Sequence, residues 1–298
     1  MSKLNLSNKC SSKISVYFRQ NATFCDFSKN ESWVVLSPIE TQIKEKIEQL
    51  GTPLKNWDIS INYGIKTGFN EAFIIDGSKR KQLINEDPKS AEIIRPILRG
   101  RDIKRYSYNF ADLWLINSHN GIKEKGIKRI EIDDYPSIKR HLDQYYPQLE
   151  KRADKGDTLY NLRNCAYMED FSKQKIVFQE MVQEPSFILD SKGTYMCLDT
   201  ARIITGENLN ILLAVMNSKL FFYAVKTFYG GGGLGEAGIR MKHTFFENFP
   251  MPVLSNDDKE KIILLADNPT KSNLNDIENI LYASYLLDKK EIEFIKLL

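Results

Sequence analysis

The chain has 298 residues, of which 42% are hydrophobic and 27% are charged. It can bury a substantial core in one large domain or two smaller ones, and no apolar run approaches the roughly 20 residues of a membrane span. A formal net charge of +3 is compatible with an anionic partner but does not require one. The local distribution of charge must therefore show whether the chain binds an anionic partner.

The first half of the chain alternates strand patterns with short helical patterns. Ser37-Pro38 is typical of a helix start, because serine caps free N–H groups and proline fits the first turn. The glycine turn at 64–68 stands between two extended runs and so predicts a strand, a turn and a second strand. The predicted segments are two strands within 13–36, a helix over 38–50, a strand–turn–strand unit over 57–76, helices at about 79–85 and 90–99, and a strand over 113–116.

The second half holds the longest predicted elements. A helix at 135–153 precedes three β-rich segments, 175–181, 186–190 and 195–205. Residues 208–228 are apolar on most faces and predict a buried helix, and the tail, 255–298, predicts two or three amphipathic helices. The order lacks a regular β-α-β alternation, so we expect an α+β fold of mainly antiparallel sheets, packed helices and a helical C-terminal tail.

The strongest charge signal is the basic cluster between Arg95 and Arg105. The cluster contains a single acidic residue, Asp102, among its arginines and lysines, and Gly100 interrupts it. We therefore expect its basic residues around a helix end and turn. An arginine there can fork onto phosphate oxygens or a guanine edge. The alternative is a solvated helix end, whose C-terminus favours cations in any case.

Two glycine-containing segments carry further side chains that are suited to bind phosphate. The glycine run 230–238 leads into a basic stretch with Arg240 and Lys242, and it lacks the strand-to-helix context of a dinucleotide-binding loop. We interpret it as a loop that lets backbone approach a ligand closely, with a plain connection as the alternative. The turn at 64–68 and the following Asn70 offer a cation, a hydroxyl and an amide, or simply form a self-capped hairpin turn.

The segment 160–167 adds aromatic and cationic side chains. Tyr160, Arg163 and Tyr167 suit stacking on bases or phosphate contact, and equally suit ordinary core packing. The basic surface around them is interleaved with Asp and Glu.

Catalytic and metal-binding patterns do not stand out in the chain. None of the four cysteines forms a CxxC pair, and none of the three histidines lies at metal-ligand spacing from another. We find no Ser-His-Asp elbow, HExxH or paired carboxylates, so no catalytic, cofactor-binding or metal-binding residue is assigned. The polar N-terminus lacks a secretory signal, and with free thiols this predicts a cytoplasmic location and no membrane partner.

Read in order, several segments resemble the specificity (target-recognition) domain of TaqI-like adenine DNA methyltransferases and type IIG restriction-modification enzymes. The resemblance is collinear over roughly residues 35–298. It implies a domain that lies against a DNA duplex and reads bases in the major groove, with the turn at 64–68, the LRGRDI segment and the glycine loop in the recognition unit. The matching stretches are GTPLKNWDISINYGIKTGFNEAFIID (51–76), EIIRPILRGRDIKRY (92–106), LWLI (113–116), RADKGDTLYNLRNCAY (152–167), KIVFQE (175–180), NLNILLAVMNSKL (208–220) and GGGLGEAGIRMKHTFFENFPMP (231–252).

The chain departs from this family in one respect that bears on activity. Enzymes of the family carry an upstream catalytic domain with an S-adenosylmethionine loop and an Asn-Pro-Pro-Tyr-type motif, and neither occurs here. We therefore leave open whether the chain is an enzyme, and expect S-adenosylmethionine and Mg only in a catalytic partner. The expected regions are 1–36, a remnant of a catalytic domain or an N-terminal extension, 37–254, the DNA target-recognition domain, and 255–298, a tail packing on the domain or on a partner.

The sequence thus predicts a module that recognises double-stranded DNA and gives target specificity to a separate adenine-specific methyltransferase or endonuclease of a restriction-modification system. One alternative is the C-terminal part of a split or truncated type IIG methyltransferase, active only with its catalytic half. Another is a protein-interaction subunit whose tail docks a partner and whose DNA binding is incidental. The predicted DNA-binding residues are Lys66, Thr67, Asn70, Arg99, Arg101, Lys104, Arg105, Arg163, Arg240 and Lys242.

Overall fold

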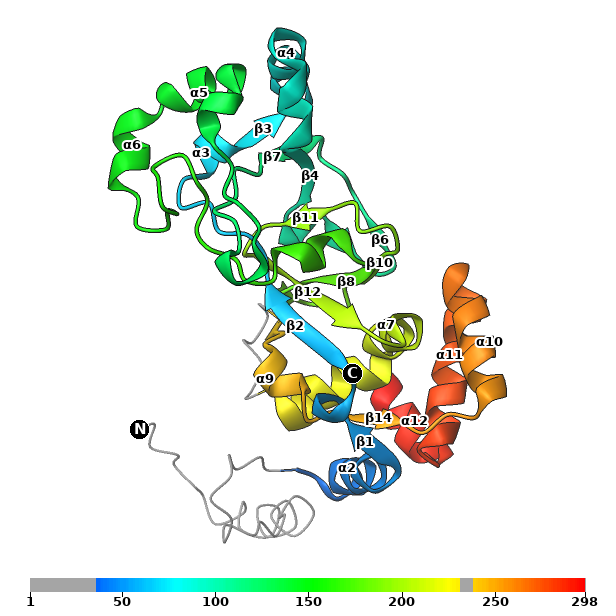
Figure 1. Ribbon diagram of the computed structural model, residues 1–298. Coiled ribbons are helices and arrows are strands. Elements are labelled where there is room, and N and C mark those ends of the chain that lie inside the picture. The colour runs from blue at the N-terminus through cyan, green and yellow to red at the C-terminus, as the bar shows by residue number, and fades with distance from the viewer. Residues whose placement is uncertain (1–35, 231–237, 298) are drawn as a thin grey trace, which may run out of the picture.

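The computed structural model describes residues 36–230 and 238–297, which form an elongated molecule (Figure 1). The helices are α2 (Pro38–Leu50), α3 (Asn70–Phe73), α4 (Gly77–Glu86), α5 (Pro136–Asp143), α6 (Tyr146–Lys151), α7 (Leu209–Met216), α8 (Lys219–Ala224), α9 (His243–Phe246), α10 (Asn256–Asp267), α11 (Lys271–Ser284) and α12 (Lys289–Lys296). The strands are β1 (Gly51–Pro53), β2 (Ile59–Tyr63), β3 (Ile74–Asp76), β4 (Ile94–Leu98), β5 (Ile103–Lys104), β6 (Ser107–Tyr108), β7 (Leu113–Ile116), β8 (Lys175–Gln179), β9 (Met181–Val182), β10 (Phe187–Asp190), β11 (Met196–Cys197), β12 (Ala201–Gly206), β13 (Ile239–Arg240) and β14 (Pro250–Pro252).

A four-stranded antiparallel sheet in the order β10-β8-β12-β2 separates two hydrophobic cores. Side chains alternate between the faces of a strand, so one strand can supply both cores. In β8, Ile176 and Phe178 belong to one core and Val177 belongs to the other, and all are fully buried. This burial on both faces explains why β8 is apolar along most of its length rather than alternating.

The first core lies between this sheet and the helices at one end of the molecule (Figure 1). It joins α2, α7 and α8 to the C-terminal tail, whose Ile262, Leu281 and Ile295 are buried in it. The predicted start of α2 is confirmed, because Ser37 and Glu40 form a reciprocal capping box. The tail forms three helices, within the two or three predicted.

The second core lies on the other face of the central sheet and extends to the opposite end of the molecule. A further sheet, β11-β4-β7-β3, contributes Ile97 and Leu115, and α5 contributes Ile138 and Leu142. Most strand pairs are antiparallel, whereas β11 runs parallel to β4. The α+β class with mainly antiparallel sheets is therefore confirmed.

The helix predicted at 90–99 is wrong, because Ile94–Leu98 forms strand β4. Proline within that segment removes a helical hydrogen bond. As a strand, the same residues bond to β7 on one side and to β11 on the other, where Cys197 lies opposite Leu98. The basic cluster consequently begins within a strand, at Arg95, and continues into the turn after it.

The strand–turn–strand unit predicted over 57–76 forms both of its strands, but the two do not pair with each other. Strand β2 forms as expected, but it pairs with β12, whereas β3 pairs with β7 in another sheet. The first residues of the predicted second strand belong to the short helix α3 instead. The glycine turn thus connects two sheets and does not close one.

Two predicted helices are interrupted. The helix expected at 135–153 forms α5 and α6, and Pro147 in the first turn of α6 cannot supply the hydrogen bond of a continuous helix. The helix expected at 208–228 forms α7 and then α8, which a π-helical turn, Val225–Tyr229, continues; the chain bends by 64° between α7 and this second helical part. In the described part of the chain no single helix is long and apolar enough to cross a membrane. The bent pair of helices is long and apolar enough only when its two parts are taken together, by length and composition alone. The strands predicted within 13–36 lie almost wholly outside the described residues.

Candidate nucleic-acid interface

Predicted DNA-binding residues from distant parts of the chain meet in one cleft of about 580 Å³. Asn70, Arg99, Arg101 and Arg240 line this cleft, together with polar side chains at the end of β8. We call it the arginine cleft. It draws on segments far apart in the sequence, so only folding brings these groups together.

The arginine cleft is organised by a tight 3₁₀ turn, Gly100–Asp102, that follows β4. The carboxylate of Asp102 accepts hydrogen bonds from the backbone N–H of Arg99, at 2.8 Å, and from its guanidinium, at 2.7 Å. The backbone N–H of Gly100 donates to Thr200 Oγ1 at 3.1 Å. A Cβ on residue 100 would lie 2.7 Å from the carbonyl oxygen of Thr200, so the turn can approach this closely only with glycine.

The two arginines beside this turn differ in availability. Arg99 is held by Asp102, and although burial alone would raise the pKa of that carboxyl, hydrogen bonds from Arg99 bring its pKa below the ordinary value. Arg101 is exposed and makes no hydrogen bond or ion pair with any described residue. Arg101 is therefore the arginine of this turn whose guanidinium is free to bind a ligand.

A buried carboxylate positions another arginine in the lining of the cleft. Glu180 accepts from Arg202 at 2.9 Å and from Arg240 Nε at 2.5 Å. Burial opposes ionisation of Glu180, but the hydrogen bonds from these arginines lower its pKa below the ordinary value, so it stays charged. Arg240 remains about half exposed. Its other guanidinium nitrogens can therefore reach a ligand while Nε is held.

The glycine turn at 64–68 is fixed by buried groups rather than by exposed ones. Thr67 is only 2% exposed, and its hydroxyl donates to Asn70 Oδ1 at 2.6 Å. Arg152, also buried, crosses behind the turn and donates to the carbonyl of Thr67. Thr67 therefore positions Asn70 at the cleft and is itself closed off from a ligand.

A second pocket of about 430 Å³ adjoins the arginine cleft, and Asp199 lines both. Lys66 and Arg163, two further predicted residues, line this pocket. A bridge between Ile65 and Leu198 joins the segments that separate the two cavities. We call it the tyrosine pocket after Tyr63 and Tyr167 in its wall.

The remaining predicted residues line neither cavity. Lys104 and Arg105 belong to the hairpin formed by β5 and β6, and the guanidinium of Arg105 lies 3.7 Å from Glu278 of the tail helix α11. Lys242 lies over the ring of Phe245 at 5.7 Å. The glycine run itself falls within 231–237, outside the described residues apart from its ends.

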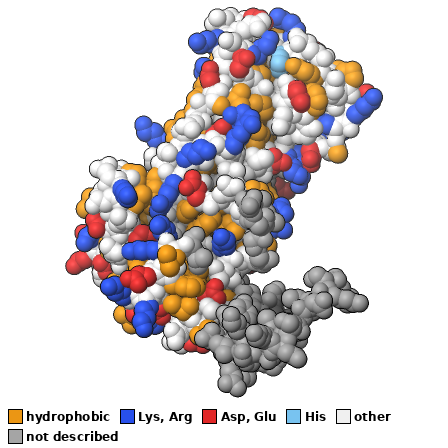
Figure 2. Space-filling view, turned by 180° about the vertical axis from the view of Figure 1, so that it is seen from behind, with side chains coloured by type: hydrophobic (Ala, Val, Ile, Leu, Met, Phe, Trp, Pro, Cys, Tyr) orange, Lys and Arg blue, Asp and Glu red, His pale blue; other side chains and the backbone are white. Residues whose placement is uncertain are grey.

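Sequence patterns alone missed several groups that line the arginine cleft. Gln179, Glu180 and Thr200 contribute the amide, carboxylate and hydroxyl of its wall. The only local signal is a polar pair, Gln179-Glu180, directly after an apolar strand. Figure 2 shows basic side chains along one face of the molecule with acidic ones among them, so charge alone does not outline the site. Among the described residues no group of His, Cys, Asp and Glu is arranged to hold a metal ion.

Comparison with known proteins gives one family, and solved structures with a similar fold include two restriction enzymes. Residues 95–250 match the TaqI-like C-terminal specificity domain. A structure of the type IIL restriction-modification enzyme MmeI in complex with DNA superimposes with a TM-score of 0.58 at 12% identity, over 82% of this chain and 35% of that one. The type IIG restriction endonuclease BpuSI superimposes with a TM-score of 0.50 at 14% identity, over 78% of this chain and 28% of that one. No curated protein matches the chain.

Proposed function

Because the chain belongs to the family of TaqI-like C-terminal specificity domains, we propose that it recognises a specific sequence in double-stranded DNA on behalf of a restriction-modification enzyme. The observation that carries this proposal is the convergence of Arg101, Arg240 and Asn70 in the arginine cleft. Arginine forks onto the guanine edge and asparagine onto the adenine edge, so these side chains are suited to base recognition in a major groove.

The division of roles among the cations follows from their partners. The guanidinium of Arg101 bonds to none of the described residues, and it is the group we assign to a base edge or a phosphate. Arg240 is oriented through Glu180 and is assigned to the DNA backbone, since its exposed nitrogens can reach phosphate. Arg99 and Thr67 shape the cleft and are assigned no direct contact.

We further propose that the enzyme served by this chain is an adenine-specific methyltransferase or endonuclease of the type IIG kind, acting in the cytoplasm. The chain spans about a third of the length of the restriction enzymes that it superimposes on. We assign methyl transfer and cleavage, with S-adenosylmethionine and Mg, to a separate catalytic unit. Besides DNA, this catalytic unit is the proposed partner of the chain.

Selection of duplexes from a random pool, followed by affinity measurements on Arg101→Ala, tests the proposal. We expect the wild-type chain to enrich one short motif that survives moderate salt. If Arg101 reads guanine, Arg101→Ala should cost about 1–3 kcal/mol on that motif and relax the preference at one position. If it touches phosphate, the loss should be uniform across sequences and the salt slope should fall by about one.

Arg140→Ala is the matched control, because Arg140 is an exposed arginine on α5 that lines neither cavity. Its affinity should equal that of the wild type. Enrichment of no motif, with binding lost steeply as salt rises, would contradict sequence recognition by this chain. Unchanged affinity of Arg101→Ala at low salt would remove Arg101 from the interface.

A further inference from the structure

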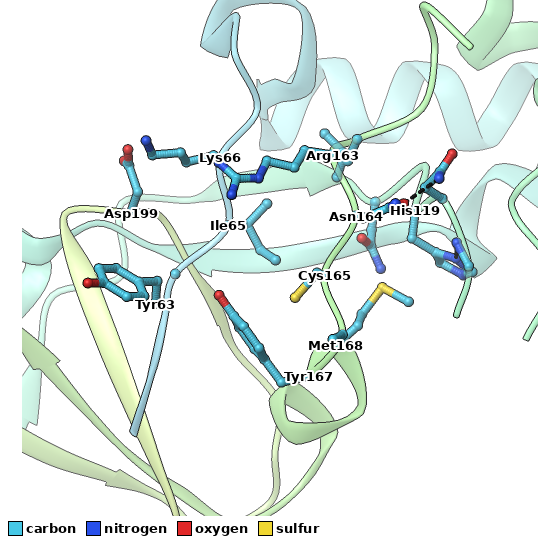
Figure 3. Close-up of a pocket in the computed structure, with 16 residues that line it drawn as sticks. Tyr63, Ile65, Lys66, His119, Arg163, Asn164, Cys165, Tyr167, Met168 and Asp199 are labelled. Atoms are coloured by element: carbon cyan, nitrogen blue, oxygen red, sulfur yellow. Dashed lines mark hydrogen bonds between the residues drawn. The ribbon is translucent and has the colours of Figure 1, made fainter. Parts of the chain in front are cut away.

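A protein that only touches the surface of a DNA duplex has no need of an enclosed pocket, yet the tyrosine pocket is one. The end of β2, the loop 117–121 and the loop 162–168 enclose a volume of about 430 Å³ (Figure 3). This volume is within the range of pockets that bind small molecules, about 300–1,000 Å³. It lies beside the arginine cleft, with which it shares the lining residue Asp199.

Aromatic and apolar side chains form the wall of the pocket. Tyr63 and Tyr167 contribute rings, and Ile65, Cys165 and Met168 contribute apolar surface between them (Figure 3). Burial raises the pKa of the Cys165 thiol to about 11, so it is uncharged at neutral pH. The guanidinium of Arg202 lies 3.9 Å from the centroid of the Tyr63 ring and fixes that ring. A planar, uncharged ligand would find stacking surface here.

Amide groups in the pocket are held so that a donor and an acceptor stay free. Asn120 donates to Asp157 Oδ1 at 3.0 Å and to Asn164 Oδ1. With its oxygen engaged, the NH₂ group of Asn164 has no hydrogen-bond partner among the described residues. The side-chain oxygen of Asn117 is buried and likewise unpaired in the described part of the chain. A buried acceptor left unpaired is costly, so a ligand that donates to it is favoured.

Cations stand on one side of the pocket. Lys66 and Arg163 lie on the same side of it in Figure 3, above Ile65. Lys66 is exposed and makes no hydrogen bond or ion pair with a described residue, and Arg163 is about half exposed while it pairs with Asp154 at 3.1 Å. Such cations suit a phosphate at the rim of a pocket whose wall suits a ring.

We propose that the tyrosine pocket binds a single nucleotide, with its base between the tyrosine-lined walls, its polar edge on Asn117 and Asn164, and its phosphate on Lys66 and Arg163. The nucleotide can come from DNA, as a base unstacked from the helix, or from solution as a free mononucleotide. The proposed DNA recognition bears only on the first of these sources. Base-edge hydrogen bonds and stacking together are the means by which proteins hold an extrahelical base.

The test compares two probes by fluorescence anisotropy with the full chain at fixed salt. One is a duplex with a single unpaired nucleotide, and the other is the same duplex with an abasic residue at that position. We expect the base-containing probe to bind about tenfold tighter, as base–aromatic stacking implies. Tyr167→Leu removes stacking surface and Ala166→Trp fills the pocket, and both should abolish this preference while leaving binding of a fully paired duplex unchanged. Tyr146→Leu, at a half-exposed tyrosine of α6, should keep the preference.

The outcomes separate this proposal from the proposed function. Equal affinity for the two probes in the wild type, or a preference that survives in both pocket variants with wild-type melting temperatures, overturns the pocket proposal. The affinity for the fully paired duplex is measured separately. The test of the pocket therefore does not decide whether the chain recognises a DNA sequence. Competition by deoxynucleoside monophosphates at millimolar concentration would identify free nucleotide as the source. Tight binding of the bulged probe without such competition would identify DNA as the source.

Discussion

At the residue scale, arginines of the same chemistry have different roles because their partners differ. Arg99 donates its hydrogen bonds to Asp102, and Arg152 donates to backbone carbonyls. Arg101 bonds to none of the described residues, so its donors are available to a ligand. A charged group that is fully bonded inside the protein stabilises structure, and one that is free at the rim of a cleft can bind. The number of arginines near a site therefore says little until their hydrogen bonds are known.

Arg152 holds the glycine turn at 64–68 from inside the protein. Its guanidinium is buried, stacks on Phe73 at 4.5 Å, and donates to four backbone carbonyls, those of Thr67, Asp154, Leu159 and Asn161. Burial lowers the pKa of Arg152 to about 10, so it remains charged at neutral pH. These bonds tie the glycine turn to the loop that carries Arg163.

Replacing Arg152 by lysine should destabilise the chain although the charge is kept. Lysine cannot fork across carbonyls on both sides, so some stay buried and unpaired, at a cost of about 2–3 kcal/mol. Urea unfolding followed by circular dichroism measures the change. Arg129→Lys, at a surface arginine paired with Glu131, should leave the free energy of unfolding nearly unchanged. Equal effects of both substitutions would contradict the role given to Arg152.

At the scale of elements, the turn Gly100–Asp102 shows how a short segment sets the site. It follows β4, an inner strand bonded to both β7 and β11, and its backbone is bonded to Thr200 beside β12. The turn therefore links the second core to the start of β12, an inner strand of the central sheet. Arg101 is placed at the cleft by these backbone contacts and not by its own side chain.

The Asp102 carboxylate gives this turn a pH-dependent stability. Its pKa is lower in the folded chain than the value of about 3.9 in the unfolded chain. The stabilisation is thus fully present at neutral pH and is lost as the pH falls below that value through the folded pKa. Asp102→Asn should cost about 2 kcal/mol at pH 7, and this difference from the wild type should shrink as the pH falls from 5 to 3. Unfolding titrations at several pH values measure it, and a difference that does not depend on pH would refute the assignment.

At the scale of the whole molecule, the C-terminal tail is part of the core. Leu281 of α11 is fully buried in the first core, and β14, just before the tail, pairs with β1 at the start of the described chain. Glu278 accepts from the backbone N–H of Lys219 at 2.6 Å. Because the apolar face of α11 is covered by its own domain, these observations favour the prediction that the tail packs on the domain over the prediction that it docks a partner.

Substitutions within the tail should reflect this burial. Leu281→Ala opens a cavity in the first core and should lower the free energy of unfolding by about 2–5 kcal/mol. Leu264→Ala removes the same atoms from a side chain that is 72% exposed on α10, and its effect should stay below about 0.5 kcal/mol. Thermal and urea unfolding of both variants provide the measurement. If Leu281→Ala instead left stability unchanged, the tail would be free to serve a partner.

Features that depend on neighbouring residues can be predicted from the sequence. Helix α2 was predicted from Ser37-Pro38 and its isoleucines, and the tail from its alternation of charge and leucine, because caps and helical periodicity act within a few residues. Collinear motifs also predicted the family. The strands β7, β8 and β10 were predicted because β-branched and aromatic runs favour extended backbone wherever they pair.

The pairing of distant segments and the freedom of individual side chains depend on contacts that form only in the folded chain. Ile94–Leu98 is a strand because β7 and β11 flank it, and β11 lies about a hundred residues further along the chain. Likewise Thr67 is closed off by Arg152, and Arg105 is turned toward the tail. Long-range contacts select among local conformations of similar energy, and hydrogen bonds made after folding decide which charged groups remain for a ligand.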